Sequence, residues 1–471
     1  MVKARIGVYG LGTMGSALAL NIAENGFSVA VTNRNTTWID GFLKEAEGLK
    51  GEVTGHMSLE AFVVGIETPR AILFMIPSGA PLDSMIEKIT PLLSPGDRII
   101  DGGNSDFHET RRRQAALEAQ GFVYIGMGVS GGEEGARFGP SIMVGGEAES
   151  FEGIRDIIEA ISAKYEGDPC ADRLGPDGAG HFVKTVHNGI EYADMQMIAE
   201  VWGILRNGKG WSPAEAGGLF TRWNAGALQS YLVEITGKAL VAIDPKTGNP
   251  MIDMIVDKAG QKGTGRWTVI EALKLGQSAS AIEAAVGGRS WSADRELRAA
   301  GEAAIEVPDG QGAELSEETL ESALLTAKIT AYAQGLTLLQ AASEEFNWNI
   351  DLARVAEVWR AGCIIRSALL DDISSAVRAG LPHGNLILAP AFLQMVKDGL
   401  PALRQVVASA ALRGLPVPAM SASLAYIETL RRARGTTDLV QAQRDFFGAH
   451  GFERRDAEGK DHHGPWAMSA G

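Results

Sequence analysis

The stretch IGVYGLGTMG, Ile6–Gly15, decides the fold of the first part of the chain. An apolar, strand-like run leads directly into a complete G-x-G-x-x-G, and the apolar segment Ala17–Ala23 that follows has the composition of a helix. In this context Gly10 permits a tight turn, Gly12 lets a pyrophosphate approach the backbone, and Gly15 allows close helix–strand packing. The helix N-terminus then offers unsatisfied N–H groups to the phosphates. The stretch therefore predicts a dinucleotide site, and glycines that serve a turn alone are the less favoured interpretation. The expected cofactor contacts are Gly10, Leu11, Gly12, Thr13, Met14 and Gly15.

The segments after this motif alternate short apolar runs with helical patterns, which is typical of βαβ units. Buried strands are expected at Arg5–Tyr9, Ser28–Thr32, Ala71–Ile76, Arg98–Ile100 and Phe122–Ile125. This rhythm predicts a Rossmann-type α/β domain with a doubly wound, mostly parallel sheet.

After about Gly178 long stretches rich in Ala, Leu, Ile and Glu replace the strands, among them Gly180–Leu205, Pro213–Leu240, Glu317–Glu345 and Ala389–Leu412. A large all-α domain is expected there, followed by a polar, extended tail. The predicted domains are 1–177 (dinucleotide-binding), 178–436 (all-helical, for substrate and dimerisation) and 437–471 (tail).

Composition excludes several classes of protein. The 471 residues are too many for one hydrophobic core, and the net charge of −15 argues against nucleic acid or an anionic membrane as partner. No apolar run approaches the ~20 residues that a membrane span needs. Cys170 and Cys363 lie far apart and belong to no metal or redox motif, so we expect a reduced, cytoplasmic protein without a metal site.

The end of the second expected strand indicates which nicotinamide cofactor is used. NAD sites usually place an Asp or Glu there to hold the ribose 2′-hydroxyl. This chain has Asn33, Arg34 and Asn35 instead. Arg34 can pair with a 2′-phosphate and stack on adenine, which favours NADP, with a solvated loop arginine as the alternative.

The stretch GAGHFVKTVHNGIEY, Gly178–Tyr192, predicts a helix with a chemically equipped face. Its positions i, i+3, i+4 and i+7 are Lys184, His187, Asn188 and Glu191, which fall within an arc of ~100°. Lys184 and Glu191 are about 10 Å apart along the axis, so an acid/base pair could flank a short sugar-like substrate. A helix whose lysine merely pairs with a neighbouring carboxylate is the alternative.

Two glycine-rich segments, Asp101–Ser105 (DGGNS) and Gly126–Gly132 (GMGVSGG), each follow an expected strand at its carboxyl end. Ligands of α/β sheets bind at that edge. These loops are similar to parts of a site for an anionic polyol, with backbone N–H groups and the Ser130 hydroxyl as contacts. Glycines that serve turns alone are an equally weighted alternative for either loop.

Together these segments resemble the decarboxylating 6-phosphogluconate dehydrogenases. The matching stretches, in the order of the family, are GLGTMG, DGGNS, VSGGEEGARFGPSIM, GAGHFVKTVHNGIEY, GQKGTGRWT (Gly260–Thr268), GCIIR (Gly362–Arg366) and QAQRDFFGAHGFE (Gln441–Glu453). The resemblance implies that 6-phosphogluconate is oxidised at C3 by NADP and loses CO2 to give ribulose 5-phosphate, a step of the pentose phosphate pathway and of gluconate utilisation.

By the same resemblance Lys184 is the base at the C3 hydroxyl and Glu191 protonates C1 of the enediol. A homodimer is implied, in which tail residues complete the partner's site. The implied substrate contacts are Asn104, Ser130, Gly131, Gly132, His187, Asn188, Tyr192, Lys262, Thr264 and Arg289, with Arg444 and His450 from the tail; Asn104 is also an expected cofactor contact, as are Asn33, Arg34 and Asn35.

The chain departs from the family pattern at two cofactor positions. A V-K-A-G segment of the family is Ile76-Pro77-Ser78-Gly79 here, and the usual Asn-Arg-Thr is Asn33-Arg34-Asn35. NAD use therefore stays open. The rival hypotheses are a β-hydroxyacid dehydrogenase for an unphosphorylated acid and a non-catalytic NADP-binding protein.

Overall fold

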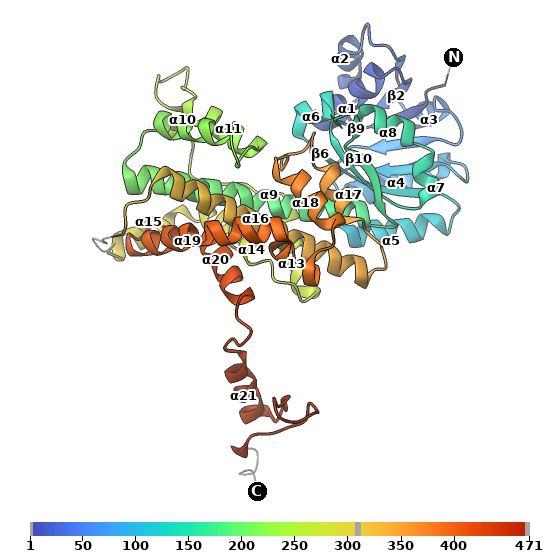
Figure 1. Cartoon of the computed structure of the whole chain (residues 1–471). Helices are drawn as coiled ribbons and strands as arrows, with labels where there is room; N and C mark the ends of the chain where they lie inside the picture. Colours follow the sequence, from blue (N-terminus) through green and yellow to red (C-terminus); the bar gives the residue numbers. More distant parts are fainter. Residues whose placement is uncertain (1–2, 307–311, 467–471) are drawn as a thin grey trace. The chain divides into compact units, whose positions relative to one another are not determined.

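The computed structural model describes residues 3–306 and 312–466 (Figure 1). It divides into two compact units, Met1–Ser423 and Leu424–Gly471. The three-part division expected from the sequence, with boundaries at 177 and 436, stays a prediction. Among the described residues, no helix combines the length and the apolar character that crossing a membrane requires.

The N-terminal part of the first unit is built on an eight-stranded sheet, counted over the described residues. In spatial order its strands are β10 (Ala171–Gly175), β7 (Ser141–Gly145), β6 (Val123–Ser130), β5 (Arg98–Asp101), β4 (Ala71–Phe74), β1 (Ile6–Tyr9), β2 (Val29–Thr32) and β3 (Val53–Gly55). All neighbours pair in parallel except β6 and β7. The prediction of a doubly wound, mostly parallel sheet is therefore confirmed.

Helices cover both faces of this sheet, and central strands such as β1, β2 and β4 are buried throughout because neither of their faces meets water. One core cluster joins one face to helices α1 (Thr13–Glu24), α2 (Thr37–Glu45), α6 (Gly132–Phe138), α7 (Ala148–Glu152) and α8 (Arg155–Ile161). The other joins the opposite face to helices α3 (Leu59–Val64), α4 (Ala80–Ile89) and α5 (Phe107–Glu118). A small hairpin of β8 (Lys164–Tyr165) and β9 (Asp168–Pro169) lies outside the sheet order.

The direction of winding reverses at β1, which lies between β2 and β4. Chain connections leave a crevice at the carboxyl ends of strands at such a switch point. The G-x-G-x-x-G turn between β1 and α1 opens into this crevice.

The remainder of the first unit is helical, as predicted, and its axis is the pair of long helices α9 (Ala179–Gly203) and α16 (Glu317–Glu345) (Figure 1). Helix α9 packs on β6 and β7 and also against α13, α14 and α16. The other helices are α10 (Pro213–Trp223), α11 (Tyr231–Val241), α12 (Met251–Met254), α13 (Thr264–Lys274), α14 (Ser280–Ala293), α15 (Arg295–Ala304), α17 (Leu352–Val358), α18 (Leu369–Arg378) and α19 (Pro390–Leu412), with a π-helical turn at Ile204–Gly208. Helix α20 (Pro418–Leu430) begins in the first unit and ends in the second.

The Ala/Leu-rich stretch Pro213–Leu240 forms two helices. Helix α10 ends at Trp223, and Ser230 begins α11 by accepting a hydrogen bond from the Val233 N–H through its side chain. The Ala/Leu-rich composition did not reveal this interruption.

The second unit, Leu424–Gly471, is organised around one buried carboxylate. Asp445 of α21 (Thr437–Gly448) accepts hydrogen bonds from the Gly451 and Gly464 N–H groups, the Trp466 indole and, at 2.6 Å, His463 Nδ1. These bonds hold the pKa of Asp445 far below its usual value. No group of three or more potential metal ligands occurs in the described residues.

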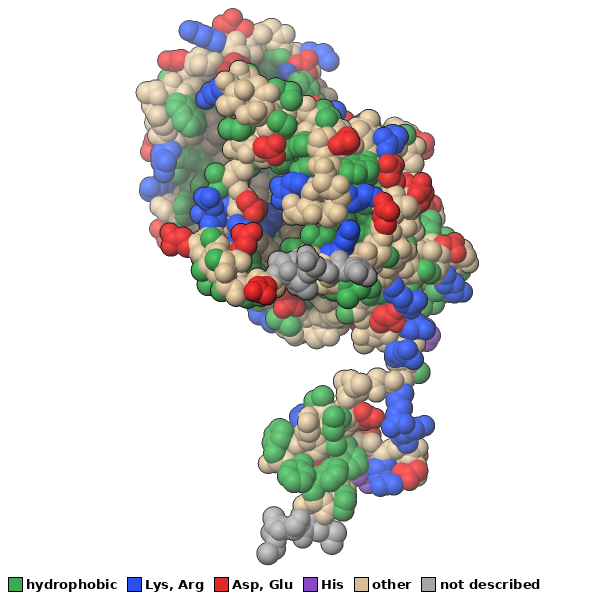
Figure 2. All heavy atoms as spheres, turned by 90° about the vertical axis from the view of Figure 1, so that its left-hand side faces the viewer, with side chains coloured by type: hydrophobic (Ala, Val, Ile, Leu, Met, Phe, Trp, Pro, Cys, Tyr) green, Lys and Arg blue, Asp and Glu red, His purple; other side chains and the backbone are tan. Residues whose placement is uncertain are grey.

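Hydrophobic side chains gather on the surface of this second unit (Figure 2). On α21 the exposed members are Leu439, Val440, Phe446 and Phe447. The positions i, i+1, i+7 and i+8 share one face of a helix, so α21 presents an apolar stripe.

Candidate active site

Helix α9 reaches the sheet at a point where β6 carries a glycine. A Cβ at Gly128 would lie 2.5 Å from Lys184 Cβ, so only glycine lets the helix lie this close. The sequence interpretation of Gly126–Gly132 as a loop is wrong in part, since β6 continues to Ser130. The chain leaves the strand only at Gly131, whose φ of 119° suits glycine.

This packing encloses the Lys184 side chain, which is buried. Its ammonium donates to Ser130 Oγ at 3.0 Å and Asn188 Oδ1 at 2.9 Å, and it lies 3.5 Å from His187 Nδ1. Within the part of the chain that the structure describes, Lys184 forms no salt bridge. The alternative of a structural ion pair is therefore wrong.

His187 and Glu191 continue the same face of α9, as the spacing predicted. The fully buried His187 lies with Nε2 at 3.3 Å from Ser130 Oγ, with Nδ1 at 3.0 Å from Asn188 Oδ1 and 3.8 Å from Glu191 Oε2. Lys184, Asn188, His187 and Glu191 thus form one connected polar row.

Burial moves the pKa values of this row toward uncharged forms. Desolvation lowers the pKa of Lys184, against the attraction of Glu191. It raises the pKa of Glu191, against the attraction of Lys184 and Arg289. Desolvation, with repulsion from Lys184, puts the pKa of His187 well below its usual value. An uncharged lysine can accept a proton and an uncharged glutamic acid can donate one, so the two side chains could serve as general base and general acid.

Further expected substrate contacts lie next to this row. Asn188 Nδ2 donates to Thr264 Oγ1, the first residue of α13, at 3.0 Å. The Arg289 guanidinium lies 3.4 Å from the centre of the Tyr192 ring and donates to the Gly260 carbonyl at 3.1 Å. Lys262 is exposed in the loop between Gly260 and α13. A hydroxyl and cationic groups therefore border one end of the polar row.

Arg444 and His450 belong to the second unit, where they line a cavity of about 720 Å³ together with residues of α21 and the segment after it. The two side chains expected to reach a partner's site therefore come together within their own unit.

The crevice at the sheet edge contains a second relevant cavity, of about 350 Å³. It is lined from the ends of β1, β2 and β4 and from α4 by Tyr9, Gly10, Gly12, Asn33, Arg34, Met75, Ile76, Pro77, Pro81, Ser84, Met85 and Lys88. Its glycines, its apolar walls and its arginine fit the adenosine end of a dinucleotide, and the α1 N-terminus adjoins it.

In the β2 loop Asn33 and Arg34 line the cavity, and the side chains of Asn33 and Asn35 also bond within the protein. Asn33 Oδ1 accepts from the Leu11 N–H at 3.1 Å, and Asn35 Oδ1 accepts from the Thr37 hydroxyl at 2.8 Å. The two asparagines thus hold the turn and the start of α2. Their expected contact with the cofactor stays a prediction.

The buried carboxylate of Asp101, which was not among the predicted site residues, stabilises the loop that carries Asn104. Asp101 accepts from the Gly103 N–H at 3.0 Å, from Ser105 Oγ at 2.6 Å and from the Tyr124 hydroxyl at 3.0 Å. Asn104 itself is exposed at the sheet edge. The sequence contained one signal for this role of Asp101, namely an acidic residue directly after the expected buried strand Arg98–Ile100.

Comparison with known proteins agrees with this geometry. Two family models match, the NAD binding domain of 6-phosphogluconate dehydrogenase over residues 5–171 and the 6-phosphogluconate dehydrogenase C-terminal domain over residues 180–466. The chain is 47% identical over 466 residues to an NADP(+)-dependent, decarboxylating 6-phosphogluconate dehydrogenase of Bacillus subtilis, which covers 98% of this chain and 99% of the relative. The decarboxylating 6-phosphogluconate dehydrogenase of Escherichia coli K12 is 45% identical with the same coverage.

Among solved structures, the 6-phosphogluconate dehydrogenase of Plasmodium falciparum, studied in its apo form and in complex with NADP+ and with 6-phosphogluconate, matches with a TM-score of 0.94 and 39% identity. The match covers 98% of this chain and 100% of that one. The resemblance found in the sequence is confirmed: over nearly its whole length, from the dinucleotide turn to the tail, the chain belongs to the 6-phosphogluconate dehydrogenase family.

Proposed function

We propose that the chain catalyses the oxidative decarboxylation of 6-phospho-D-gluconate to D-ribulose 5-phosphate and CO2, with reduction of NADP. The observation that carries this proposal is the polar row of α9, in which the buried Lys184 is connected through Asn188 and His187 to the half-buried Glu191. Desolvation favours the uncharged form of both Lys184 and Glu191. A base and an acid on one helix face suit a reaction that first removes and later adds a proton.

Lys184, uncharged, accepts the proton of the C3 hydroxyl as C3 is oxidised. NADP bound in the crevice, where Gly10, Gly12 and Arg34 would hold it, would supply the acceptor for the hydride of C3. Lys184 then returns a proton to the C3 oxygen as the bond between C1 and C2 breaks and CO2 leaves, since protonation gives the electrons of that bond a place to go. Glu191 donates a proton to C1 of the resulting enediol, the former C2 of the substrate, while Lys184 accepts the proton of the enediol hydroxyl on the former C3. Lys184 is then protonated and Glu191 ionised, and the return of one proton from Lys184 to Glu191 restores the starting state, so that protons and charges balance.

The neighbouring side chains bind the substrate in this proposal. Ser130, His187 and Asn188 hold its hydroxyls and carboxylate, because their polar atoms surround the Lys184 ammonium. Asn104, Gly131 and Gly132 complete that end. The phosphate is bound by Tyr192, Lys262, Thr264 and Arg289.

We further propose a homodimer in which Arg444 and His450 of each tail complete the phosphate site of the partner subunit. Support comes from the compact second unit, which exposes an apolar stripe on α21 and carries both residues around one cavity. The unpaired thiols of Cys170 and Cys363 accord with a cytoplasmic protein.

A steady-state assay tests the function. The purified chain is given 6-phosphogluconate with NADP and, in parallel, with NAD, and formation of reduced nicotinamide and of CO2 are followed. Turnover with both products supports the proposal, and the ratio of the two rates gives the cofactor preference. Turnover only with an unphosphorylated 3-hydroxy acid would favour the β-hydroxyacid dehydrogenase alternative, and no turnover would favour a binding role.

A further inference from the structure

We propose that Lys88 of α4 is a second cation for the 2′-phosphate of the cofactor and that, with Arg34, it makes the chain prefer NADP over NAD. The inference rests on the proposed use of a nicotinamide cofactor. It concerns a residue that neither the dinucleotide motif nor the β2 loop points to.

Lys88 shares one face of α4 with the other residues through which this helix reaches the crevice. Those residues are Pro81, Ser84 and Met85, so the four occupy positions i, i+3, i+4 and i+7. Residues at this spacing lie above one another on a helix. Lys88 therefore extends the cofactor wall of α4 by one turn.

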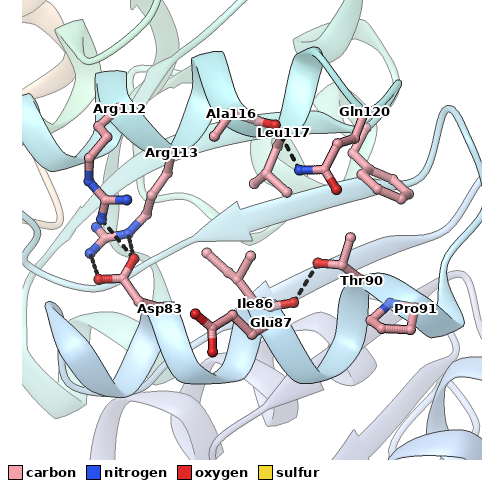
Figure 3. Close-up of a pocket in the computed structure, with 11 residues that line it drawn as sticks. Asp83, Ile86, Glu87, Thr90, Pro91, Arg112, Arg113, Ala116, Leu117 and Gln120 are labelled. Atoms are coloured by element: carbon pink, nitrogen blue, oxygen red, sulfur yellow. Dashed lines mark hydrogen bonds and ion pairs between the residues drawn. The ribbon is translucent and has the colours of Figure 1, made fainter.

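The orientation of this face is fixed from the other side of the helix (Figure 3). There Asp83 points to α5, where its Oδ1 accepts from Arg112 Nη2 at 2.8 Å and from Arg113 Nε at 2.7 Å. The two arginines lower the pKa of Asp83 to about 2, so the carboxylate stays charged and paired over the working range of the protein. Leu82 and Ile89 are buried in the core beside it. Rotating α4 about its axis, so that the face with Lys88 turned away from the crevice, would break these contacts.

The charge of the cavity matches a phosphorylated ribose. Arg34 and Lys88 are the cations among its lining residues, and none of the lining residues is a carboxylate. Within the described residues neither cation has an ion-pair partner. The lining contains no Asp or Glu that could hold a ribose 2′-hydroxyl. It contains two unpaired cations, one from the β2 loop and one from α4, whose charge a 2′-phosphate would neutralise.

Apart from its polar and charged residues, the cavity has apolar walls, which include Met75, Ile76, Pro77 and Met85. An apolar slot of this kind suits a purine ring, whose ribose then carries its phosphate toward charged side chains. Pro77 contributes no charge at the end of β4. Lys88 supplies the cation from the helix instead, which explains how the site can favour NADP despite Pro77.

The experiment compares the full-length chain with Lys88→Met, which keeps the aliphatic stem, and Lys88→Arg, which keeps the charge. Lys44→Met serves as the control, because Lys44 is exposed on α2 and is not part of the cavity lining. Calorimetry gives the affinities for adenosine 2′,5′-bisphosphate and for 5′-AMP, which differ only in the 2′-phosphate. The ratio of kcat/KM for NADP and NAD is measured on the same proteins.

We expect Lys88→Met to weaken binding of the 2′,5′-bisphosphate about tenfold, the effect of one charge-assisted hydrogen bond, and to leave 5′-AMP binding within about twofold. The NADP/NAD ratio should fall by a similar factor, and Lys88→Arg should restore most of both. An unchanged affinity, or equal losses for the two nucleotides, would overturn the inference. Because nucleotide binding needs no turnover, a chain inactive on 6-phosphogluconate would refute the proposed function while the binding result still decides the role of Lys88.

Discussion

Lys184 and Glu191 lie two turns apart on α9, and burial pushes their pKa values in opposite directions, each toward its uncharged form. A solvated lysine and glutamate at this spacing would both be charged at neutral pH. Here burial shifts each side chain toward the state that a proton acceptor and a proton donor require. The first two predictions follow from this relationship.

Replacing Lys184 by Met should abolish turnover without disturbing cofactor binding. The methionine has a similar volume and removes a buried cation, so the fold should persist. General-base catalysis typically contributes a factor of about 10² to 10⁴, and kcat should fall by at least that much. Single-turnover kinetics measure the loss, and titration with adenosine 2′,5′-bisphosphate checks the cofactor site. A variant that keeps most of its rate would contradict the assignment of Lys184 as the base.

The rate should depend on pH through this pair. Activity falls toward acid as Lys184 gains a proton and can no longer accept one, and it falls toward alkali as Glu191 loses the proton that it must donate. The plot of rate against pH is therefore bell-shaped, and its two limbs give the apparent pKa values of the coupled pair. Glu191→Gln should lower kcat and remove the alkaline limb, because glutamine does not titrate. Profiles of kcat for the two proteins decide this, and an unchanged alkaline limb in the variant would assign that limb to another group.

The tail proposal predicts complementation between two inactive proteins. Arg444→Ala removes a phosphate contact donated to the partner, and Lys184→Met removes the base of its own subunit. In a mixed dimer the site of the Arg444→Ala chain retains Lys184 and is completed by the intact tail of the Lys184→Met chain. After co-refolding of equal amounts, half of the dimers are mixed with one working site each, so activity should return to about a quarter of the wild-type value. Absence of any gain over the two separate variants would place Arg444 in the site of its own chain or outside it.

The fold was predictable where its signals are local. Strands β1, β2, β4 and β5 each contain a short apolar run. Helix α16 spans the expected Glu317–Glu345, and α9 spans Ala179–Gly203 where Gly180–Leu205 was expected. The extension of β6 through Gly126 and Gly128 was not predictable, because glycine is required there by close contacts with residues distant in sequence. A Cβ at Gly126 would meet His181 and Thr110, and one at Gly128 would meet Lys184. Without those partners the segment has the composition of a loop.

The same distinction holds for the site. The polar row of α9 follows from helical spacing, since Lys184, His187, Asn188 and Glu191 lie within eight residues of one helix. The importance of Lys88 and Asp101 depends on elements packed around them, α4 on α5 and β5 beside β6. Spacing along the chain contains no information about such contacts, so only the folded arrangement reveals them.

Glu200 gives the last prediction, because its carboxylate is buried near the end of α9 and acts on a segment more than 200 residues away. Its two oxygens accept from the Ala419 and Met420 N–H groups at 2.8 and 2.9 Å, at the start of α20, and Gln196 Nε2 donates to it at 3.1 Å. Desolvation outweighs these bonds and raises the pKa of Glu200 to about 7. A raised pKa means that the folded state binds the proton more tightly than the unfolded chain. The resulting stability is complete below the unfolded value near 4.5 and is lost as the pH rises to about 7.

The shift corresponds to roughly 3 kcal/mol at most. The wild-type protein should therefore lose more stability between pH 5 and pH 8 than Glu200→Gln, which cannot titrate. Denaturant unfolding of both proteins at the two pH values measures the difference, and all other titrating groups cancel in it. Since α20 leads from the first unit into the tail, the same comparison of kcat/KM for 6-phosphogluconate shows whether ionisation of Glu200 also loosens the tail. Equal pH dependence of stability in the two proteins would mean that water reaches the carboxylate and that its pKa is ordinary.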